Sequence, residues 1–572
     1  MQGAELLVKM LEAHDVRNIF GLPGDTSMAF YDALKDSRSI RHIMGRDERS
    51  CGYMADAYAR LSGRPGVTEA PSGGGAAYLY PAVLEADGSS IPLVALTSDV
   101  PLSSENRGAL TAMDQVAAYR TATRFTSRLT RPEFIPHSVR TAFRAATGGR
   151  MGAAHLAFPE DVLSGVVDVD DHLYASPECS RFPAWRTRPD AQRLEEAAEL
   201  LLHADRPLIL TGGGVILSGA MQALQTLAEQ LGIGVVTTMD GKGSIRETHP
   251  LALGVIGSNG GKAASNRTLS ESDVVLAIGS NLNSTSTWGW TLLKDASVIH
   301  VDVDPNQLDN NIACEVTIQA DAKLFLADLA EATRSSGNKG QWGQWVQAAR
   351  KDVQTETDSI SKIKSDQPGV LHPGEVITAL RGVLPDNAVI IADAGTPTPY
   401  LAAYYPTKVP GKSVYAARAH GSLGYALPAA LGANVARPGS PIVAVTGDGS
   451  LGMSIGELEA LMREGEGITI LHLRNETFGW IKMLQKLYYS ERYFSVDFDP
   501  RADYTDAARG LGARATKVTT AQGLTDALAA SLEEDLSFIE VEVPPEIEAT
   551  PPVAAWERDI GIPAEQRSRR SY

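Results

Sequence analysis

The chain has 572 residues, of which 43% are hydrophobic and 21% charged, and its formal net charge is −17. This length exceeds what a single hydrophobic core serves and predicts three or four domains. The acidic balance argues against a nucleic-acid-binding surface, so we expect small molecules and further copies of the chain as partners.

The cysteines and the first residues indicate where the protein resides. Cys51, Cys179 and Cys314 lie far apart and form no CxxC pair, which favours a reducing compartment. The chain begins with an amphipathic helical pattern that carries Glu5 and Glu12 and lacks the basic start and apolar block of a signal peptide. No run of about 18 apolar residues occurs, so we expect no membrane span and a cytoplasmic protein.

The first block, residues 1–165, repeats a short β-branched run, a glycine-rich turn and a helical pattern, which is typical of parallel α/β units. Strands are expected at 16–24, 41–45, 66–74, 91–100 and 153–161. The helical pattern RDERSCGYMADAYAR follows the second strand and has Glu48 in its first turn. The helix dipole alone favours an acid there, so this segment by itself does not show whether Glu48 does more.

Two further blocks repeat the same rhythm. In the second, residues 190–335, strands are expected at 206–215, 234–243, 272–280 and 297–305. In the third, residues 371–545, they are expected at 388–396, 441–450, 467–476 and 537–543. Polar stretches at 166–189 and 335–368 separate the blocks, and residues 546–572 are expected to form an extended tail or a lid. The sequence therefore predicts three α/β domains with doubly wound parallel sheets.

The strongest chemical motif lies in the third block, where an apolar strand ends in Gly447-Asp448-Gly449-Ser450 and the next strand ends at Asn475. Carboxyl ends of parallel strands meet at one edge of a sheet, where α/β proteins bind ligands. Small residues and a helix N-terminus suit a phosphate, and Asp448 and Asn475 offer the oxygen ligands that Mg²⁺ prefers. A Gly-Asp-Gly turn alone is weak evidence, but both loops together are far more specific.

On these residues the chain resembles the thiamine diphosphate (ThDP) enzyme superfamily, in which a Gly-Asp-Gly and Asn motif binds the Mg-diphosphate of the cofactor. The resemblance implies Mg²⁺ ligation by Asp448, Asn475 and the backbone carbonyl of Thr477. Arg474 departs from the pattern because it replaces the first of two usual asparagines. Since the second asparagine is the metal ligand, the site should survive this change.

The segment GRDERSCGYMADAYARLSGRPGV at 45–67 looks like the acetolactate synthase version of the region that carries the family's catalytic glutamate. Glu48 falls on that position. In the family this carboxylate contacts N1′ of the cofactor's pyrimidine and stabilises the imino tautomer that removes the thiazolium proton. It reaches across to a neighbouring subunit, so the resemblance also implies an obligate dimer or a dimer of dimers.

Other loops match the family as well. GLPGD at 21–25 and PSGGGAAYL at 71–79 resemble the loops of the pyrimidine-binding domain, although Gly74 and Tyr78 depart from the usual residues. Gln115 aligns with a glutamine that reaches the active site, and Leu423 stands where the synthases carry a methionine wedge under the cofactor. Phe478 and Trp480 either narrow the substrate pocket or belong to the core. The cofactor-binding candidates are Gly24, Gly74, Gly395, Thr396, Pro397, Gly421, Leu423, Gly447, Asp448, Gly449, Ser450, Asn475, Thr477, Phe478, Gly479 and Trp480.

The second block resembles the central domain of this superfamily, which holds FAD in some members, ADP or part of coenzyme A in others, and nothing in the rest. Gly212 to Gly214 suit a nucleotide diphosphate. The segment AIGSNLNSTSTWGW lacks the arginine-rich stretch that grips FAD, and Asn259 stands where a histidine is common. The occupant of this domain stays open, and FAD, if bound, is expected to be structural.

The resemblance implies a ThDP- and Mg²⁺-dependent enzyme that breaks or forms a carbon–carbon bond next to a carbonyl. Decarboxylation of a 2-oxo acid with carboligation, as in acetolactate synthases, is the first expectation. A 2-hydroxyacyl-CoA lyase or oxalyl-CoA decarboxylase is the alternative, with the basic RSRR segment at 567–570 either binding a coenzyme A phosphate or simply exposed. A non-catalytic nucleotide-binding scaffold is disfavoured because Glu48, Asp448 and Asn475 occur together. The donor and acceptor substrates stay open.

Overall fold

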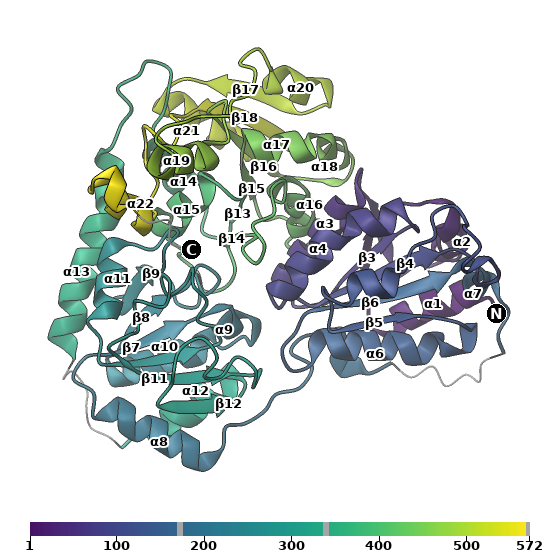
Figure 1. Ribbon diagram of the computed structural model, residues 1–572, viewed down its shortest axis with the longest axis horizontal. Helices are drawn as coiled ribbons and strands as arrows, with labels where there is room; N and C mark the ends of the chain where they lie inside the picture. Colours follow the sequence, from purple (N-terminus) through teal and green to yellow (C-terminus); the bar gives the residue numbers. More distant parts are fainter. Residues whose placement is uncertain (169–174, 336–341, 568–572) are drawn as a thin grey trace.

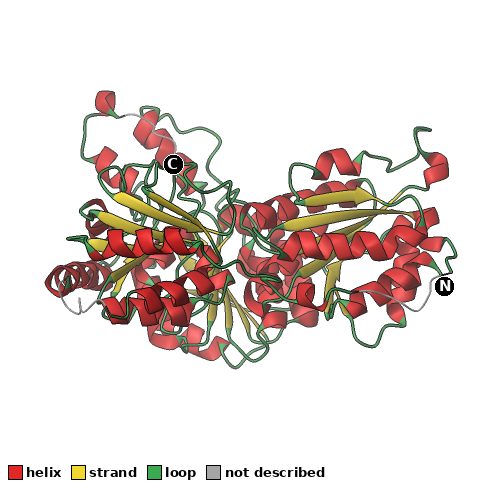
Figure 2. Cartoon of the chain, turned by 90° about the horizontal axis from the view of Figure 1, so that it is seen from below, coloured by secondary structure: helices red, strands yellow, loops and turns green. Residues whose placement is uncertain are grey.

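Three six-stranded sheets, in which every pair of neighbouring strands is parallel, organise the chain in the computed structural model. The structure describes residues 1–168, 175–335 and 342–567, so residues 568–570 of the basic C-terminal segment lie outside the described residues. Figure 1 shows the first unit beside the other two, and Figure 2 shows strands layered between helices. The predicted fold class is therefore confirmed.

The first sheet has the order β2-β1-β3-β4-β6-β5. Its strands are β1 (Asn18–Gly21), β2 (Arg41–Met44), β3 (Gly66–Ala70), β4 (Leu93–Asp99), β5 (Phe125–Arg128) and β6 (Ala153–Pro159). The helices are α1 (Gly3–Ala13), α2 (Met28–Lys35), α3 (Glu48–Ser62), α4 (Gly74–Gly88), α5 (Gln115–Tyr119), α6 (Ile135–Thr147) and α7 (Glu160–Ser164). All five predicted strands form here, and the edge strand β5 was missed.

The central sheet has the order β12-β11-β10-β7-β8-β9, which is the strand order of dinucleotide-binding folds. Its strands are β7 (Pro207–Thr211), β8 (Gly234–Thr237), β9 (Ala252–Val255), β10 (Val274–Ile278), β11 (Ser297–Asp302) and β12 (Val316–Gln319). The helices are α8 (Ala191–Leu202), α9 (Gly213–Leu217), α10 (Met221–Leu231), α11 (Ala263–Ser270), α12 (Ala322–Ala332) and α13 (Gly343–Ser359). Much of the polar stretch after this unit is thus the long helix α13, which buries Val346 and Val353.

The third sheet, β14-β13-β15-β16-β18-β17, repeats the strand order of the first. Its strands are β13 (Val389–Ala392), β14 (Val414–Ala416), β15 (Ile442–Gly447), β16 (Ile468–Arg474), β17 (Arg514–Val518) and β18 (Leu536–Glu542). The helices are α14 (Pro373–Val383), α15 (Pro397–Tyr404), α16 (Ala426–Ala436), α17 (Asp448–Ser454), α18 (Leu458–Glu464), α19 (Gly479–Tyr488), α20 (Tyr504–Gly510), α21 (Ala521–Ser531) and α22 (Ala554–Ile560).

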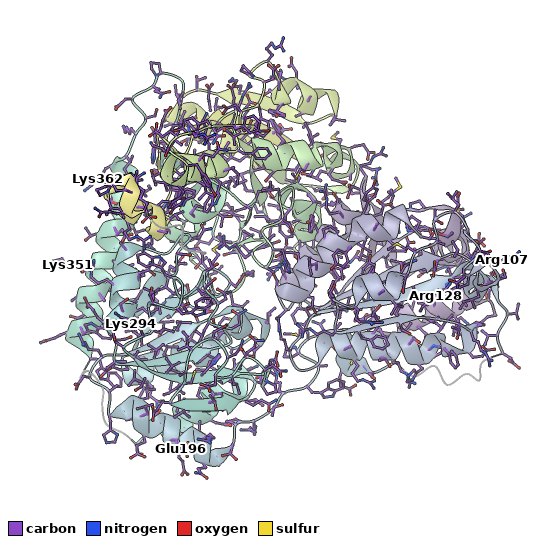
Figure 3. All side chains as sticks on the ribbon, in the orientation of Figure 1. Arg107, Arg128, Glu196, Lys294, Lys351 and Lys362 are labelled. Carbon is purple, nitrogen blue, oxygen red and sulfur yellow. The ribbon has the colours of Figure 1, made fainter. Side chains whose placement is uncertain are left out.

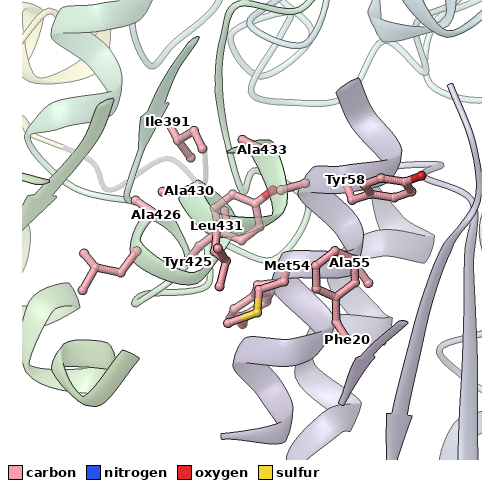
Figure 4. Close-up of a cluster of buried hydrophobic side chains, with 14 of the residues drawn as sticks. Phe20, Met54, Ala55, Tyr58, Ile391, Tyr425, Ala426, Ala430, Leu431 and Ala433 are labelled. Atoms are coloured by element: carbon pink, nitrogen blue, oxygen red, sulfur yellow. The ribbon is translucent and has the colours of Figure 1, made fainter. Parts of the chain in front are cut away.

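The first and third units share a core along α3 and α16, drawn in Figure 4. The helices approach so closely that a Cβ on Gly432 would overlap the carbonyl oxygen of Met54. Beside this contact, buried Asp56 accepts hydrogen bonds from Arg60 Nε at 2.7 Å and from Tyr425 Oη at 2.5 Å. The pairing satisfies a charge that would otherwise be costly to bury.

Charged side chains are distributed over the periphery. Lys294, Lys351 and Lys362 are exposed, and Lys351 and Lys362 lie at the outer margin of the molecule in Figure 3. In the part of the chain that the structure describes, no helix is long and apolar enough to cross a membrane.

Candidate active site

Two neighbouring strands of the third sheet bring the Gly-Asp-Gly turn and Asn475 together. β15 ends at Gly447 and β16 at Arg474, and these strands pair in parallel. The Asp448 carboxylate is 4% exposed, and its Oδ2 accepts the N–H of Asn475 at 2.8 Å and of Glu476 at 3.1 Å. One carboxylate therefore joins the two loops that the sequence analysis paired.

The loop after Asn475 is held in a tight turn. Glu476 has a φ of +59°, a backbone conformation that is uncommon for a residue with a side chain. The Thr477 N–H donates to Asn475 Oδ1 at 3.3 Å, and the Thr477 hydroxyl donates to the carbonyl of Val496 at 2.8 Å. These bonds present carboxylate, amide and carbonyl oxygens on adjoining loops, a donor set that suits Mg²⁺. Among the described residues no three His, Cys, Asp or Glu side chains cluster to hold a metal by themselves, so cofactor oxygens would complete such a site.

A buried charge network lies beneath Asp448, and the sequence analysis missed it. His472 is fully buried, with its ring nitrogens 3.6 Å from Asp448 Oδ1 and 3.5 Å from a Glu540 oxygen. Burial lowers the pKa of His472, but the two carboxylates raise it more, so the net shift is upward. Arg474 bridges Glu540 at 3.4 Å and Glu476 at 2.9 Å. The sequence does contain a signal for this network, because a histidine and an arginine are unusual within an otherwise apolar buried strand.

Glu546, also missed, connects the diphosphate loops to the C-terminal segment. It is 2% exposed, accepts a short hydrogen bond from the hydroxyl of Thr396, and accepts another from Asn475 Nδ2 at 3.3 Å. Burial raises the pKa of Glu546, and the charge of Asp448 raises it further. A Cβ on Gly479 would overlap this carboxylate. Thr396, Asn475 and Gly479, three of the predicted cofactor residues, therefore meet at Glu546.

The other residues predicted to bind the diphosphate shape the backbone and its packing in these loops. Gly395 and Gly421 have φ of +106° and +65°, where a side chain would be strained, and Pro397 begins α15. A Cβ on Gly449 would overlap the Phe478 ring. Ser450 is buried on α17, whereas Leu423 is half-buried before α16.

The aromatic candidates pack against neighbours. Phe478 stacks edge-on against Phe498 with ring centroids 4.7 Å apart. Trp480 lies 4.3 Å from Trp556 of α22, and the hydroxyl of Tyr488 donates to Asp559 at 2.6 Å. These contacts place α22 on α19 (Figure 1).

The loops of the first unit converge on Glu48. Asp47 caps α3 by accepting the N–H of Ser50 at 3.2 Å, so Glu48 is the first residue of the helix, and it is 9% exposed. Its Oε1 lies 3.0 Å from the Cβ position of Gly75, and Pro71 lies 2.5 Å from that of Gly24. Burial raises the pKa of Glu48.

Gly74 and Gln115, the remaining candidates of the first unit, differ in their surroundings. The Cβ position of Gly74 has open space around it. Gln115 is 1% exposed; its amide oxygen accepts a short bond from the Thr97 hydroxyl, and its nitrogen donates to the Ser98 carbonyl at 2.9 Å. The Gln115 side chain is thus held inside the first unit, and its contact with a substrate stays a prediction.

Within one chain, Glu48 and the Asp448 loops do not join. Arg49 Nη2 donates to the carbonyl of Met453 at 2.8 Å, and the N–H of Arg46 donates to Glu457 at 3.1 Å. The start of α3 therefore contacts the end of α17 remote from Asp448. Over the described ranges, no hydrogen bond or ion pair links Glu48 to Asp448.

A cavity of about 480 Å³ lies among the three units. It adjoins β7 and β10, the two strands between which the strand order of the central sheet reverses. The carboxyl ends of β7 and β10 line it, which is where such sheets bind ligands. Gly212 and Gly214 are needed there because a Cβ on either would crowd Gly279 or Ser280.

Basic side chains of the third unit face this cavity. Lys412 donates to the Asp240 carbonyl at 2.7 Å, and burial lowers its pKa to about 8. Arg418 also lines the cavity, and burial lowers its pKa. Asn259 contributes a buried Oδ1 without a hydrogen-bond partner. The cavity thus combines cationic groups with an open polar acceptor.

Comparisons with known proteins give matches in each of the three units. Models of the thiamine pyrophosphate enzyme match in three parts: the N-terminal TPP binding domain at 1–118, the central domain at 194–329 and the C-terminal TPP binding domain at 393–541. A probable acetolactate synthase large subunit of Methanocaldococcus jannaschii is 34% identical, with 97% of this chain and 93% of the relative aligned. The acetolactate synthase large subunit of Corynebacterium glutamicum is 32% identical over 92% of this chain and 84% of the relative.

Proposed function

Because the chain belongs to the thiamine pyrophosphate enzymes, in their acetolactate synthase-like group, we propose that it uses ThDP and Mg²⁺ to decarboxylate a 2-oxo acid and join the remaining fragment to a carbonyl acceptor. The observation that carries this proposal is the junction at Asp448, whose Oδ2 ties the Asn475 loop to the Gly-Asp-Gly turn. The names of the aligned relatives support the 2-oxo acid as donor.

The roles of this chain's residues follow from their chemistry. When bound, ThDP supplies an acidic thiazolium carbon and the electron sink that loss of CO₂ requires. Asp448, Asn475 and the Thr477 carbonyl would hold Mg²⁺, which offsets the diphosphate charge. Glu48, as a buried carboxylate, would hold a proton at the pyrimidine N1′.

Asp448→Ala tests the diphosphate end. The variant should lose ThDP retention in Mg²⁺ buffer, because both the metal ligand and the link between the loops disappear. Equilibrium dialysis measures the affinity, and Asp506→Ala on the exposed face of α20 is the matched control. Unchanged affinity in Asp448→Ala would remove the basis of the proposal.

Glu48→Gln tests the pyrimidine end. The substitution keeps size and hydrogen bonding but removes the charge, and electrostatic contributions of this kind are commonly worth about 10²- to 10³-fold in rate. Exchange of the thiazolium C2 proton for deuterium, followed by quenching and NMR, isolates this step from substrate choice. Exchange as fast as in the wild type would return Glu48 to the role of a helix-cap acid.

We also propose that Glu48 serves the diphosphate loops of a second copy, which makes the working unit a homodimer or a dimer of dimers. Within the chain, Arg49 beside Glu48 contacts Met453 at the end of α17 opposite to Asp448, and this contact supports the arrangement. Mixing inactive Glu48→Gln and Asp448→Ala chains should restore about a quarter of the sites, because each mixed dimer regains one intact pair. If both residues acted within one chain, every mixture would stay inactive.

The cavity among the three units is proposed to hold a nucleotide. Its volume lies in the range of small-molecule sites, and Lys412 and Arg418 suit a phosphate. Material released on denaturation, separated by chromatography and read by its absorption spectrum, would distinguish FAD, ADP and a coenzyme A nucleotide. Reduction of a bound flavin by a 2-oxo acid would contradict a purely structural role.

The acceptor, and the choice against an acyl-CoA substrate, require a substrate panel. Products should include CO₂ and a 2-hydroxy-3-oxo acid if a 2-oxo acid is both donor and acceptor. Cleavage of an acyl-CoA without turnover of any 2-oxo acid would instead favour the CoA-dependent alternative. The cytoplasmic location stays a prediction.

A further inference from the structure

An acidic residue stands inside the first sheet where only apolar side chains are expected. Glu69 belongs to β3, pairs in register with Gly21 of β1 and Leu96 of β4, and is 3% exposed. A carboxyl group on a central strand is costly to bury unless it has partners. Glu69 lies two residues before Pro71, whose ring lies against the Cβ position of Gly75, as the Glu48 carboxylate does.

Tyr31 and His42 form a hydrogen-bonded chain that ends on Glu69. Tyr31 Oη donates to Glu69 Oε2 at 2.6 Å, and His42 Nε2 lies 3.1 Å from the same hydroxyl. Since the phenol hydrogen is used on Glu69, His42 must donate through Nε2–H. The other carboxyl oxygen, Oε1, is buried without a partner.

Gly21 makes room for this cluster. Its φ is not positive, so its backbone does not require glycine. A Cβ at this position would stand 2.9 Å from Tyr31 Oη and 3.2 Å from Glu69 Cβ, which is closer than side-chain carbons normally approach. The glycine therefore leaves the space in which the Tyr31 and Glu69 side chains meet.

The groups that face Glu69 come from every element packed on it: Ser27 before α2, Tyr31 on α2, His42 on β2, and Glu48 and Cys51 on α3. Burial raises the pKa of Glu69 to about 8, the hydroxyls of Tyr31 and Ser27 lower it, and the charge of Glu48 raises it. Burial also lowers the pKa of His42 to about 4, so that ring is neutral.

We propose that Glu69, held by Tyr31 and His42 behind the pyrimidine loops, stays protonated while Glu48 is ionised and so sets the charge available for cofactor activation. Two carboxyl groups in one low-dielectric pocket do not both ionise readily, and unequal environments assign the proton to one of them. Glu69 is the more deeply buried acid and therefore keeps the proton. The inference rests on the proposed function of Glu48.

Glu69→Gln tests the inference because glutamine imitates the protonated acid. The rate of C2 proton exchange in ThDP-loaded protein should match the wild type at neutral pH and diverge above about pH 8, where the wild type alone gains a second charge. Tyr31→Phe removes a donor to the charged form, so the inflection should move to higher pH. Infrared spectra of cofactor-free protein should show a protonated carboxyl that Glu69→Gln lacks.

The outcomes separate the two proposals. A constant change in rate at all pH values in Glu69→Gln, with no carboxyl band lost, would mean that Glu69 is only structural and would overturn the inference. A difference at neutral pH that disappears at lower pH would mean that Glu69 is already ionised at neutral pH, which would also overturn the inference. If Glu48→Gln exchanged the C2 proton at the wild-type rate, the proposed role of Glu48 would fail first.

Discussion

Glu69→Gln should also change how the stability of the first unit depends on pH. An acid with a higher pKa in the folded protein than in the unfolded chain contributes stability that is present below the unfolded value and is lost as the pH rises through the folded value. For Glu69 these two pKa values are 4.5 and about 8. Each tenfold difference in proton affinity is worth about 1.4 kcal/mol, so the wild type should lose about 5 kcal/mol relative to the variant across this range.

Cys51 provides the assay. Its thiol is 0% exposed on α3, and α3 lies against β3, which carries Glu69. With Cys179 and Cys314 replaced by serine, modification of Cys51 reports opening of this unit. At a given pH, the ratio of modification rates in the two proteins gives the difference in opening free energy, because the thiol chemistry cancels.

The Cys51 modification rate of the wild type, divided by that of Glu69→Gln, should be near unity at about pH 4.5. This ratio should rise up to about pH 8, because the wild type opens more readily as Glu69 ionises, and should be constant above that pH. Glu85→Gln on α4 is a comparison with a second buried acid, which accepts backbone N–H groups of Ala419 and His420; burial raises the pKa of Glu85 as well, so its ratio should change with pH in the same direction. A ratio for Glu69→Gln that does not change with pH would refute the reasoning. It would mean that Glu69 has the same proton affinity in the folded and unfolded chain.

Three further changes test other parts of the structure. Gly432→Ala should force α3 and α16 apart and cost about 1–3 kcal/mol in denaturant unfolding, whereas Gly382→Ala on α14, with open space at its Cβ position, should not. Tyr425→Phe removes the donor to Asp56 and should cost about 1–3 kcal/mol, with exposed Tyr78→Phe as the control. Glu540, whose pKa is lowered to about 2 by His472 and Arg474 against the effect of burial, stabilises the fold above its unfolded pKa of 4.5. The wild type should therefore lose stability relative to Glu540→Gln as the pH falls from about 4.5 to about 2, and parallel unfolding curves would contradict this.

Strand prediction succeeded for every interior strand, and among the edge strands only β2 was predicted. The strands that were missed are β5, β9, β12, β14 and β17, and each stands at an edge of its sheet. Central strands are buried on both faces and are therefore continuous apolar runs. An edge strand such as Arg514–Val518 is largely exposed, so its composition does not differ from that of a loop.

The local sequence was sufficient to locate the two loops of the candidate site. Gly447 to Ser450 and Asn475 each follow an apolar run, and the carboxyl ends of such runs lie at the same edge of a parallel sheet. It also placed Glu48 at the first turn of its helix, where Asp47 provides the cap. Only the tertiary structure brought Glu546 onto Thr396 and Asn475, a contact across some 70 to 150 positions of the chain.

The same holds for Glu69, which the structure buries on a central strand against Tyr31. Spacing along the chain specifies which groups share an element, since helices and strands have fixed periods. It does not specify which elements pack together or how much water they exclude. Burial and the neighbouring charges decide whether a carboxyl group is ionised. The tertiary structure, which buries Glu69 and brings it close to Glu48, therefore decides the protonation of both acids.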